Sequence, residues 1–231
     1  MATDFVHLHC HSEFSLLDGL ASAKDLCEVC AKQGMSALAL TDHGVMFGAV
    51  EFYRAAQAAG VKPILGSELY VARNSRFDRG GGERGAGAYH LTVLARSETG
   101  YKNLLQLASK AQLEGFYYKP RVDKDILAAH SQGLVITTGC PSAEIPRLLL
   151  DNKLDEAYKV ASWYRDVFGQ GNYFVEIQNH PIDFIPDLTG KLVDLSRKLD
   201  IPLVATNDVH YARATDAHAH EVLLCIRRRR R

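Results

Sequence analysis

The sequence lacks the motifs of several common enzyme classes. It contains no G-x-x-x-x-G-K-[ST] loop for nucleotide phosphates, no G-x-S-x-G turn for a nucleophilic serine and no Rossmann fingerprint for a dinucleotide. No apolar run approaches the roughly 20 residues that cross a bilayer, so we expect no membrane association. What remains is a chain of 231 residues, 47% of them hydrophobic, which suffices for a sizeable core in one large domain or two small ones.

Cysteines are few, and none suggests a disulfide framework. The chain has five of them and no charged-then-apolar leader, which indicates a reducing compartment, so we expect a cytoplasmic protein. Cys27 and Cys30 form a C-x-x-C pair that could indicate zinc or redox chemistry. They fall within a helical pattern of apolar residues, however, and we predict that both are core positions.

An excess of charge of either sign is also absent. The formal net charge is zero, and residues 227–231 are all arginine, so that without this tail 22 basic residues face 27 acidic ones. A surface that coats nucleic acid generally is therefore not expected. Acidic groups gathered around bound cations would be neutralised locally, which leaves a phosphate-bearing substrate compatible with this balance.

Apolar runs alternate with helical patterns along the chain, which predicts an α/β fold. Seven strands are expected, at residues 7–11, 37–41, 63–71, 90–95, 134–138, 173–178 and 202–206. Helices are expected at residues 22–34, 45–59, 98–114, 142–150, 153–168, 184–199 and 216–226. The regular alternation favours a parallel barrel over an open sheet, and the Gly- and Arg-rich stretch at 74–88 is expected to be a mobile surface loop.

The opening segment concentrates histidine. His7, His9 and His11 alternate with apolar residues, so an extended backbone would place all three imidazoles on one face. A satisfied polar edge is the simpler interpretation for any one of them. Three together, with Asp18 close behind, favour a metal site, because neutral imidazole is the commonest metal ligand.

Further side chains of ligand type fall mostly at or just past the predicted strand ends, where parallel barrels carry their active sites. The exception is His90, which begins its predicted strand. The complete candidate ligand set is His9, His11, Asp18, His43, Glu68, His90, Cys140, Asp208 and His210.

Nine candidate ligands exceed the four positions of one tetrahedral ion, so two or three ions that share carboxylates are expected. Imidazole with a thiolate favours zinc over magnesium or calcium, with iron and manganese as alternatives. Such clusters activate water and clamp phosphate oxygens, which makes phosphoester hydrolysis the natural reaction. Cys140 could instead be a nucleophile, but no base is present that is not also a candidate ligand.

Substrate contacts are predicted in two places. The segment GFYYKPRVD at 115–123 is aromatic and basic, which suits contact with nucleic acid, although a packed surface turn is an equal alternative. We take Tyr117, Lys119 and Arg121 from this segment, and His180 after the strand at 173–178, as candidate substrate-binding residues.

Several motifs together resemble a known family. HLHCHSEFSLLDG, TDHG, GSELYV, HLTVLA, GFYYKPRVD, GCPS and ATNDVHY are similar to the PHP (polymerase and histidinol phosphatase) domain of the bacterial DNA polymerase III alpha subunit. The resemblance covers residues 5 to about 226, so we expect a PHP domain at 1–226 and an arginine tail at 227–231, disordered or artificial. It implies a distorted seven-stranded (β/α)7 TIM-like barrel in the bacterial cytoplasm.

The resemblance also implies three divalent ions, usually taken as zinc, with Mn²⁺ and Fe²⁺ as alternatives. One ion would be held by His9, His11, Glu68 and Asp208, a second by Glu68, His90 and Cys140, and the third by Asp18, His43 and His210. Glu68 would bridge two ions, and Glu68 and Asp208 would position a metal-bound hydroxide. His7 matches no ligand and is expected to support or pack against the site.

The implied activity is 3′ to 5′ proofreading hydrolysis of DNA, with the 3′ end of DNA, the remaining polymerase domains and other replisome subunits as partners. The polymerase domains are not found in this chain, so no polymerase activity is expected from it. Two alternatives stay open. One is a structural metal-binding module without catalysis, and the other is a small-molecule phosphatase of the histidinol phosphatase type.

Overall fold

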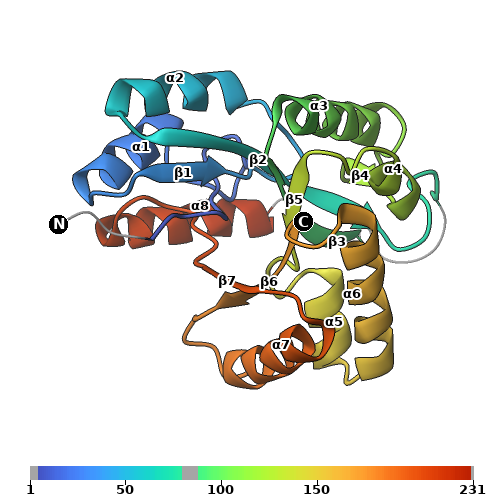
Figure 1. The fold of residues 1–231 in the computed structure, drawn as a ribbon. Helices are drawn as coiled ribbons and strands as arrows, with labels where there is room; N and C mark the ends of the chain where they lie inside the picture. The colour runs from blue at the N-terminus through green and yellow to red at the C-terminus, as the bar shows by residue number, and fades with distance from the viewer. Residues whose placement is uncertain (1–4, 80–87, 230–231) are drawn as a thin grey trace. The chain divides into compact units, whose positions relative to one another are not determined.

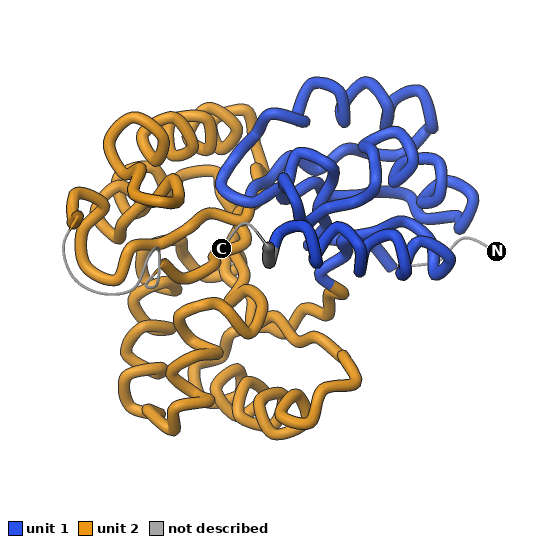
Figure 2. Tube along the Cα trace, turned by 180° about the vertical axis from the view of Figure 1, so that it is seen from behind, with its two compact units in different colours: residues 1–67, 208–231 blue, residues 68–207 orange. Residues whose placement is uncertain are grey.

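The computed structural model of the chain describes residues 5–79 and 88–229. It divides into two compact units: unit 1 comprises residues 1–67 and 208–231, and unit 2 comprises residues 68–207 (Figure 2). Among the helices of the described residues, none combines the length and apolar character needed to span a membrane.

Unit 1 is built on a short parallel pair of strands. Strand β1 (Ala37–Leu40) pairs with the first residues of β2 (Lys62–Ala72), in the register Ala37↔Lys62. Helices α1 (Ala23–Lys32) and α2 (Ala49–Ala59) pack on each other beside this pair (Figure 1). The unit ends with the 3₁₀ turn η1 (Ala214–Asp216) and helix α8 (Ala217–Arg229).

The start of α1 follows the sequence prediction. Ser22 is extended, and its hydroxyl accepts a hydrogen bond from the Asp25 N–H at 3.1 Å, as an N-cap residue does. Cys27 and Cys30 are buried in the core of this unit, and the Cys30 thiol donates to the Ala37 carbonyl. Their prediction as core positions is confirmed.

The opening segment does not form the regular strand that was predicted. It makes isolated parallel bridges, from His7 to Leu38 and from Cys10 to Val209, so it exchanges partners after a few residues. The expected common face is therefore broken. His7 and Cys10 line a cavity of about 290 Å³, whereas His9 and His11 approach Asp208.

Unit 2 contains the rest of β2 and a mixed set of strands. In chain order these are β3 (Ala88–Ala95), β4 (Arg121–Val122), β5 (Leu134–Thr137), β6 (Tyr173–Gln178) and β7 (Leu203–Thr206). Strand β4 pairs with β2, and β6 lies between β5 and β7, all parallel, but β3 and β5 are antiparallel. The expectation of an all-parallel sheet was wrong at β3.

Five helices connect these strands. They are α3 (Glu98–Leu113), α4 (Lys124–Ala129), α5 (Glu144–Leu150), α6 (Leu154–Phe168) and α7 (Ile185–Leu199). Helices α5, α6 and α7 contact one another (Figure 1). Strand β4 lies within the segment at 115–123 that was interpreted as a loop, and helix α4 was not predicted, because two and six residues respectively carry too little periodicity to be recognised.

The expected α/β fold with seven strands is thus confirmed, with β4 in place of the opening segment. Two segments differ from their predictions. Residues 80–87 of the Gly- and Arg-rich stretch lie outside the described residues, but Arg76 at its start is fixed by ion pairs to Glu114 and Asp123. Helix α8 continues to Arg229, beyond the predicted end at 226, and residues 230–231 lie outside the described range.

Candidate metal-binding site

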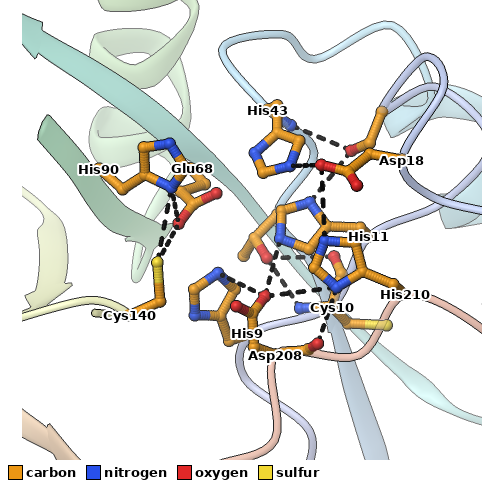
Figure 3. A network of polar contacts seen from close by, with 12 residues as sticks. His9, Cys10, His11, Asp18, His43, Glu68, His90, Cys140, Asp208 and His210 are labelled. Atoms are coloured by element: carbon orange, nitrogen blue, oxygen red, sulfur yellow. Dashed lines mark hydrogen bonds and ion pairs between the residues drawn. The ribbon is translucent and has the colours of Figure 1, made fainter. Parts of the chain in front are cut away.

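In unit 1, two buried histidines converge on one carboxylate. The Nε2 atoms of His9 and His11 lie 3.3 and 3.2 Å from Oδ1 of Asp208 (Figure 3). Metal–ligand distances of ~2.1 Å at tetrahedral angles would separate two ligand atoms by roughly 3.4 Å. The three atoms therefore have the spacing of ligands around one small cation.

The backbone holds these side chains in place. The His11 N–H donates to the Val209 carbonyl at 2.7 Å, and the Val209 N–H donates to the His9 carbonyl at 3.1 Å, so the two segments are tied on both sides of the site. Asp208 has a left-handed backbone with φ of 48°, a conformation that aspartate adopts more readily than most residues. This local turn presents its carboxylate to the histidines.

A second group in unit 1 shares His11. The ring nitrogens of His11, His43 and His210 lie within 4.8 Å of one another, and the His11 and His210 rings stack with centroids 4.4 Å apart. Oδ2 of Asp18 lies 2.9 Å from Nε2 of His43 and 3.9 Å from Nε2 of His210. The structure thus brings together the three residues predicted for the third ion.

Asp18 also contacts two residues that the sequence did not single out. Arg227 places Nη1 2.5 Å from Oδ2 of Asp18, and the His220 ring nitrogen Nε2 lies 2.8 Å from its carbonyl oxygen. Burial acts to raise the pKa of the Asp18 carboxyl, but the hydrogen bond from His43 and the charges of His210 and Arg227 outweigh it and hold that pKa well below its usual range. Asp18 is therefore an anionic ligand candidate at neutral pH.

Unit 2 carries three donors of its own, Glu68, His90 and Cys140, called here the Glu68 group. Nδ1 of His90 lies 2.9 Å from Oε1 of Glu68, and Sγ of Cys140 lies 3.5 Å from each of these atoms (Figure 3). With a metal–thiolate distance of ~2.3 Å, sulfur would lie roughly 3.6 Å from another ligand atom. Imidazole, carboxylate and thiolate together fit zinc better than magnesium or calcium.

The antiparallel direction of β3 explains the position of His90. His90 lies near the start of β3, whereas Cys140 follows the end of β5. Because these strands run in opposite directions, the start of one and the end of the other reach the same edge. The bridge between His90 and Ala143 fixes this contact.

A family comparison identifies the chain. The model of the PHP domain matches residues 7–180, which is most of the sequence. The chain is a member of the PHP domain family. This family assignment was predicted from the sequence motifs and is confirmed.

Curated relatives of this PHP domain are named DNA polymerase III subunit alpha. Those from Treponema pallidum and Thermus aquaticus are each 51% identical over 96% of this chain, and that from Mycobacterium tuberculosis is 42% identical over 97%. The chain spans about one fifth of the length of these relatives, since the aligned regions make up 19%, 18% and 20% of them.

Two solved structures share the fold. A proposed metal-dependent phosphoesterase from Bifidobacterium adolescentis superposes with a TM-score of 0.53 at 17% identity, covering 89% of this chain and 86% of that one. An amidohydrolase from Chromobacterium violaceum gives a TM-score of 0.53 at 14% identity, covering 94% and 96%. At these identities the likeness concerns the fold, and it supports the expected TIM-like PHP architecture.

The predicted substrate residues of the PHP domain fall in different settings. Nζ of Lys119 donates to the Tyr70 hydroxyl at 3.2 Å, and the Tyr70 ring meets His90 edge-on at 5.2 Å between centroids, so Lys119 lies one side chain away from the Glu68 group. Arg121 instead donates to the carbonyls of Gly115, Arg76 and Asp78, which favours the packed-turn alternative for this residue.

Within the described residues, no hydrogen bond, ion pair or ring contact joins Tyr117 or His180 to the donor groups. The Tyr117 ring lies against Tyr118 and under the Arg121 guanidinium. His180 is partly exposed just past β6. Their role in substrate binding stays a prediction.

Besides Arg227 and His220, the sequence interpretation overlooked two further residues next to the donors. Tyr70 connects Lys119 to His90, but it lies in an apolar strand where tyrosine is ordinary. Asp42 adjoins His43 in the TDHG motif and is almost completely buried. The sequence signal that could have identified Asp42 is its position directly before the candidate ligand His43.

Proposed function

We propose that this PHP domain is a metal-dependent phosphoesterase that hydrolyses DNA from the 3′ end as part of a DNA polymerase III alpha subunit. The observation that carries the proposal is the spacing of the donor atoms, 3.2 and 3.3 Å in the His9, His11 and Asp208 group and 3.5 Å around Cys140. The curated relatives, named DNA polymerase III subunit alpha, support the polymerase part of the proposal. The solved neighbour described as a metal-dependent phosphoesterase supports the hydrolytic part.

The nine predicted ligands would hold up to three divalent ions, with zinc favoured by the donor types. Bound there, such ions lower the pKa of water and neutralise charge on a phosphodiester. The side chains of the protein attract these ions and hold them in position. Asp208 and Asp18 supply negative charge that attracts cations, and the buried imidazoles fix their positions.

Lys119 is the residue best placed to bind the substrate. Its ammonium is held by the Tyr70 hydroxyl and lies 4.8 Å from the centre of the Tyr70 ring. A positive charge beside the Glu68 group would attract a phosphate of the DNA backbone and orient the 3′ end toward the donors. The predicted role of Glu68 as a bridging ligand belongs to this proposal as well.

The test compares metal content and DNA digestion in the purified 231-residue chain. We expect His9→Ala with His11→Ala to lose bound metal and to reduce removal of a mispaired 3′ nucleotide to background. A matched control replaces His130 and His218 by alanine. His130 lies in unit 2 with Nδ1 near the Ile126 carbonyl, and the exposed His218 pairs only loosely with Glu221, so this variant should keep its metal and its activity.

Three outcomes would overturn the proposal in different ways. Undiminished digestion by the His9→Ala, His11→Ala variant would show that the group of His9, His11 and Asp208 is not the active site. Unfolding on chelation, with no digestion in any metal, would favour the structural module. Rapid turnover of histidinol phosphate with inert DNA would favour the small-molecule phosphatase.

A further inference from the structure

Asp42 is a buried carboxylate that the proposed function does not use. It is 1% exposed, and its oxygens accept hydrogen bonds from neighbouring groups on the opening loop. The Ser12 N–H donates to Oδ1 at 2.8 Å, the Ser12 hydroxyl donates to Oδ2 at 2.9 Å, and the Ser15 hydroxyl donates to Oδ1 at 2.7 Å. The Ser67 hydroxyl donates to the Asp42 carbonyl at 2.9 Å, which fixes the backbone as well.

Ser15 lies between Asp42 and the metal-site histidines. Its Oγ accepts a hydrogen bond from the His43 N–H at 3.1 Å and lies 3.0 Å from Nδ1 of His11. A hydroxyl has one hydrogen to donate. Because the shortest contact of Oγ is with the carboxylate, that hydrogen is directed to Asp42, and Oγ faces His11 as an acceptor.

This arrangement selects one tautomer of the His11 ring. Nδ1 must carry the hydrogen that it donates to Ser15, so the lone pair of the neutral ring is on Nε2. Nε2 is the atom that lies 3.2 Å from Oδ1 of Asp208. The opposite tautomer would direct an N–H at Asp208 and remove the lone pair that a cation needs.

We propose that Ser15, aligned by Asp42, is a positioning residue that holds His11 as its Nδ1–H tautomer and so presents the Nε2 lone pair to the metal site. The inference rests on the metal site of the proposed function, but the tautomer is a property of the chain without metal. Hydrogen bonds of this kind to the far nitrogen of a metal-binding histidine orient the ring and raise its basicity.

The experiment measures the tautomer first. The metal-free chain, labelled with ¹⁵N histidine, is examined by long-range ¹H–¹⁵N NMR at about pH 8, above the usual histidine pKa of ~6.5. We expect His11 of the wild-type chain to carry its hydrogen on Nδ1. Ser15→Ala removes the acceptor, and Asp42→Ala frees the Ser15 hydroxyl to donate to His11, so both variants should shift the population toward Nε2–H.

Zn²⁺ affinity, measured by competition with a chromophoric chelator, gives a second readout. Ser15→Ala should weaken binding by roughly 10–100-fold, the cost typical of losing such a supporting hydrogen bond. Ser12→Ala is the matched control, because it also removes a hydroxyl that donates to Asp42, whereas the hydrogen bond to the His11 ring in the described structure comes from Ser15. It should keep the tautomer and lose less than about tenfold in affinity. Ser15→Thr retains the hydroxyl, so unlike Ser15→Ala it should keep the Nδ1–H tautomer of His11 and the Zn²⁺ affinity of the wild-type chain.

The outcomes separate this inference from the proposed function. A wild-type His11 that carries its hydrogen on Nε2, or a Ser15→Ala chain that keeps Nδ1–H and full Zn²⁺ affinity, would overturn the inference even if the chain digests DNA. The expected tautomer shift in a chain without nuclease activity would sustain the inference while refuting the proposed function. Circular dichroism verifies that each variant is folded, and if Asp42→Ala is not, Ser15→Ala decides.

Discussion

Replacing Glu176 by alanine should destabilise unit 2 by about 4 kcal/mol. Glu176 is 1% exposed on β6, and its carboxylate gathers donors from three strands. The hydroxyls of Thr137 on β5 and Thr206 on β7 donate to it, and Nε2 of Gln178 donates to Oε1 at 2.8 Å. These bonds join strands that are distant in sequence, so their loss should affect the unit as a whole.

The magnitude follows from the donors that would be left in the interior. Each buried donor without its acceptor costs about 1–3 kcal/mol, so three would cost roughly 3–9 kcal/mol. Part of this is offset because the cost of burying a carboxylate disappears and because threonine hydroxyls can rotate. About 4 kcal/mol would be a large share of the roughly 5–15 kcal/mol that stabilises a typical domain.

Urea denaturation followed by circular dichroism measures this change in the free energy of unfolding. Glu176→Gln keeps the shape and one carbonyl acceptor, so it should cost about 1–2 kcal/mol. Glu156→Ala removes a glutamate on α6 that is 60% exposed and should change stability by less than about 0.5 kcal/mol. A Glu176→Ala chain that loses under about 1 kcal/mol would refute the reasoning, because the three donors would then have found other partners.

Three further substitutions test packing and metal selectivity. Gly100→Ala would place a Cβ 1.8 Å from the Gly133 carbonyl oxygen and should lower the free energy of unfolding, measured by urea denaturation, by about 3 kcal/mol. The control is Gly190→Ala in helix α7, where a Cβ meets nothing within 4 Å, so this variant should be neutral or more stable by about 0.5 kcal/mol. Equal effects of the two substitutions would contradict the close approach at Gly100. Cys140→Ser should lower the Zn²⁺ affinity by more than the roughly 10–100-fold that is typical of losing a supporting residue. It should affect Mn²⁺ binding less, because manganese prefers oxygen ligands to thiolate. An unchanged Zn²⁺ affinity in the chelator competition would exclude the thiolate as a ligand.

The sequence predicted most elements because their signals are local. The apolar runs that became β1, β2, β5 and β6 are bounded by glycine or polar residues, and Gly60 ends α2 in the left-handed conformation expected of a C-cap. The direction of β3 could not be predicted in this way, since periodicity gives the faces of a strand but not its partner. The candidate ligands were found from their residue types and positions, and the family resemblance supplied their grouping around three ions, which local patterns alone could not give.

The opening segment shows where alternation fails. Its period of two predicted three histidines on one face, but hydrogen bonds to β1 on one side and to Val209 on the other hold each residue separately. His7 consequently lines a cavity with Cys10, whereas His9 and His11 approach Asp208. Pairing with two distant segments decided the orientation, and neither pairing is encoded within the segment itself.

The loop at residues 12–19, which follows the opening segment, positions two side chains of the candidate site in unit 1. A Cβ at Gly19 would lie 2.0 Å from the Ser12 carbonyl oxygen, so the loop from Ser12 to Gly19 closes on itself more tightly than another residue would allow. This closure places Ser15 against Asp42, and it presents Asp18 to His43. The same turn therefore delivers a candidate ligand and the hydroxyl that orients another. Its tight backbone thus sets the positions of Ser15 and Asp18 beside His11 and His43.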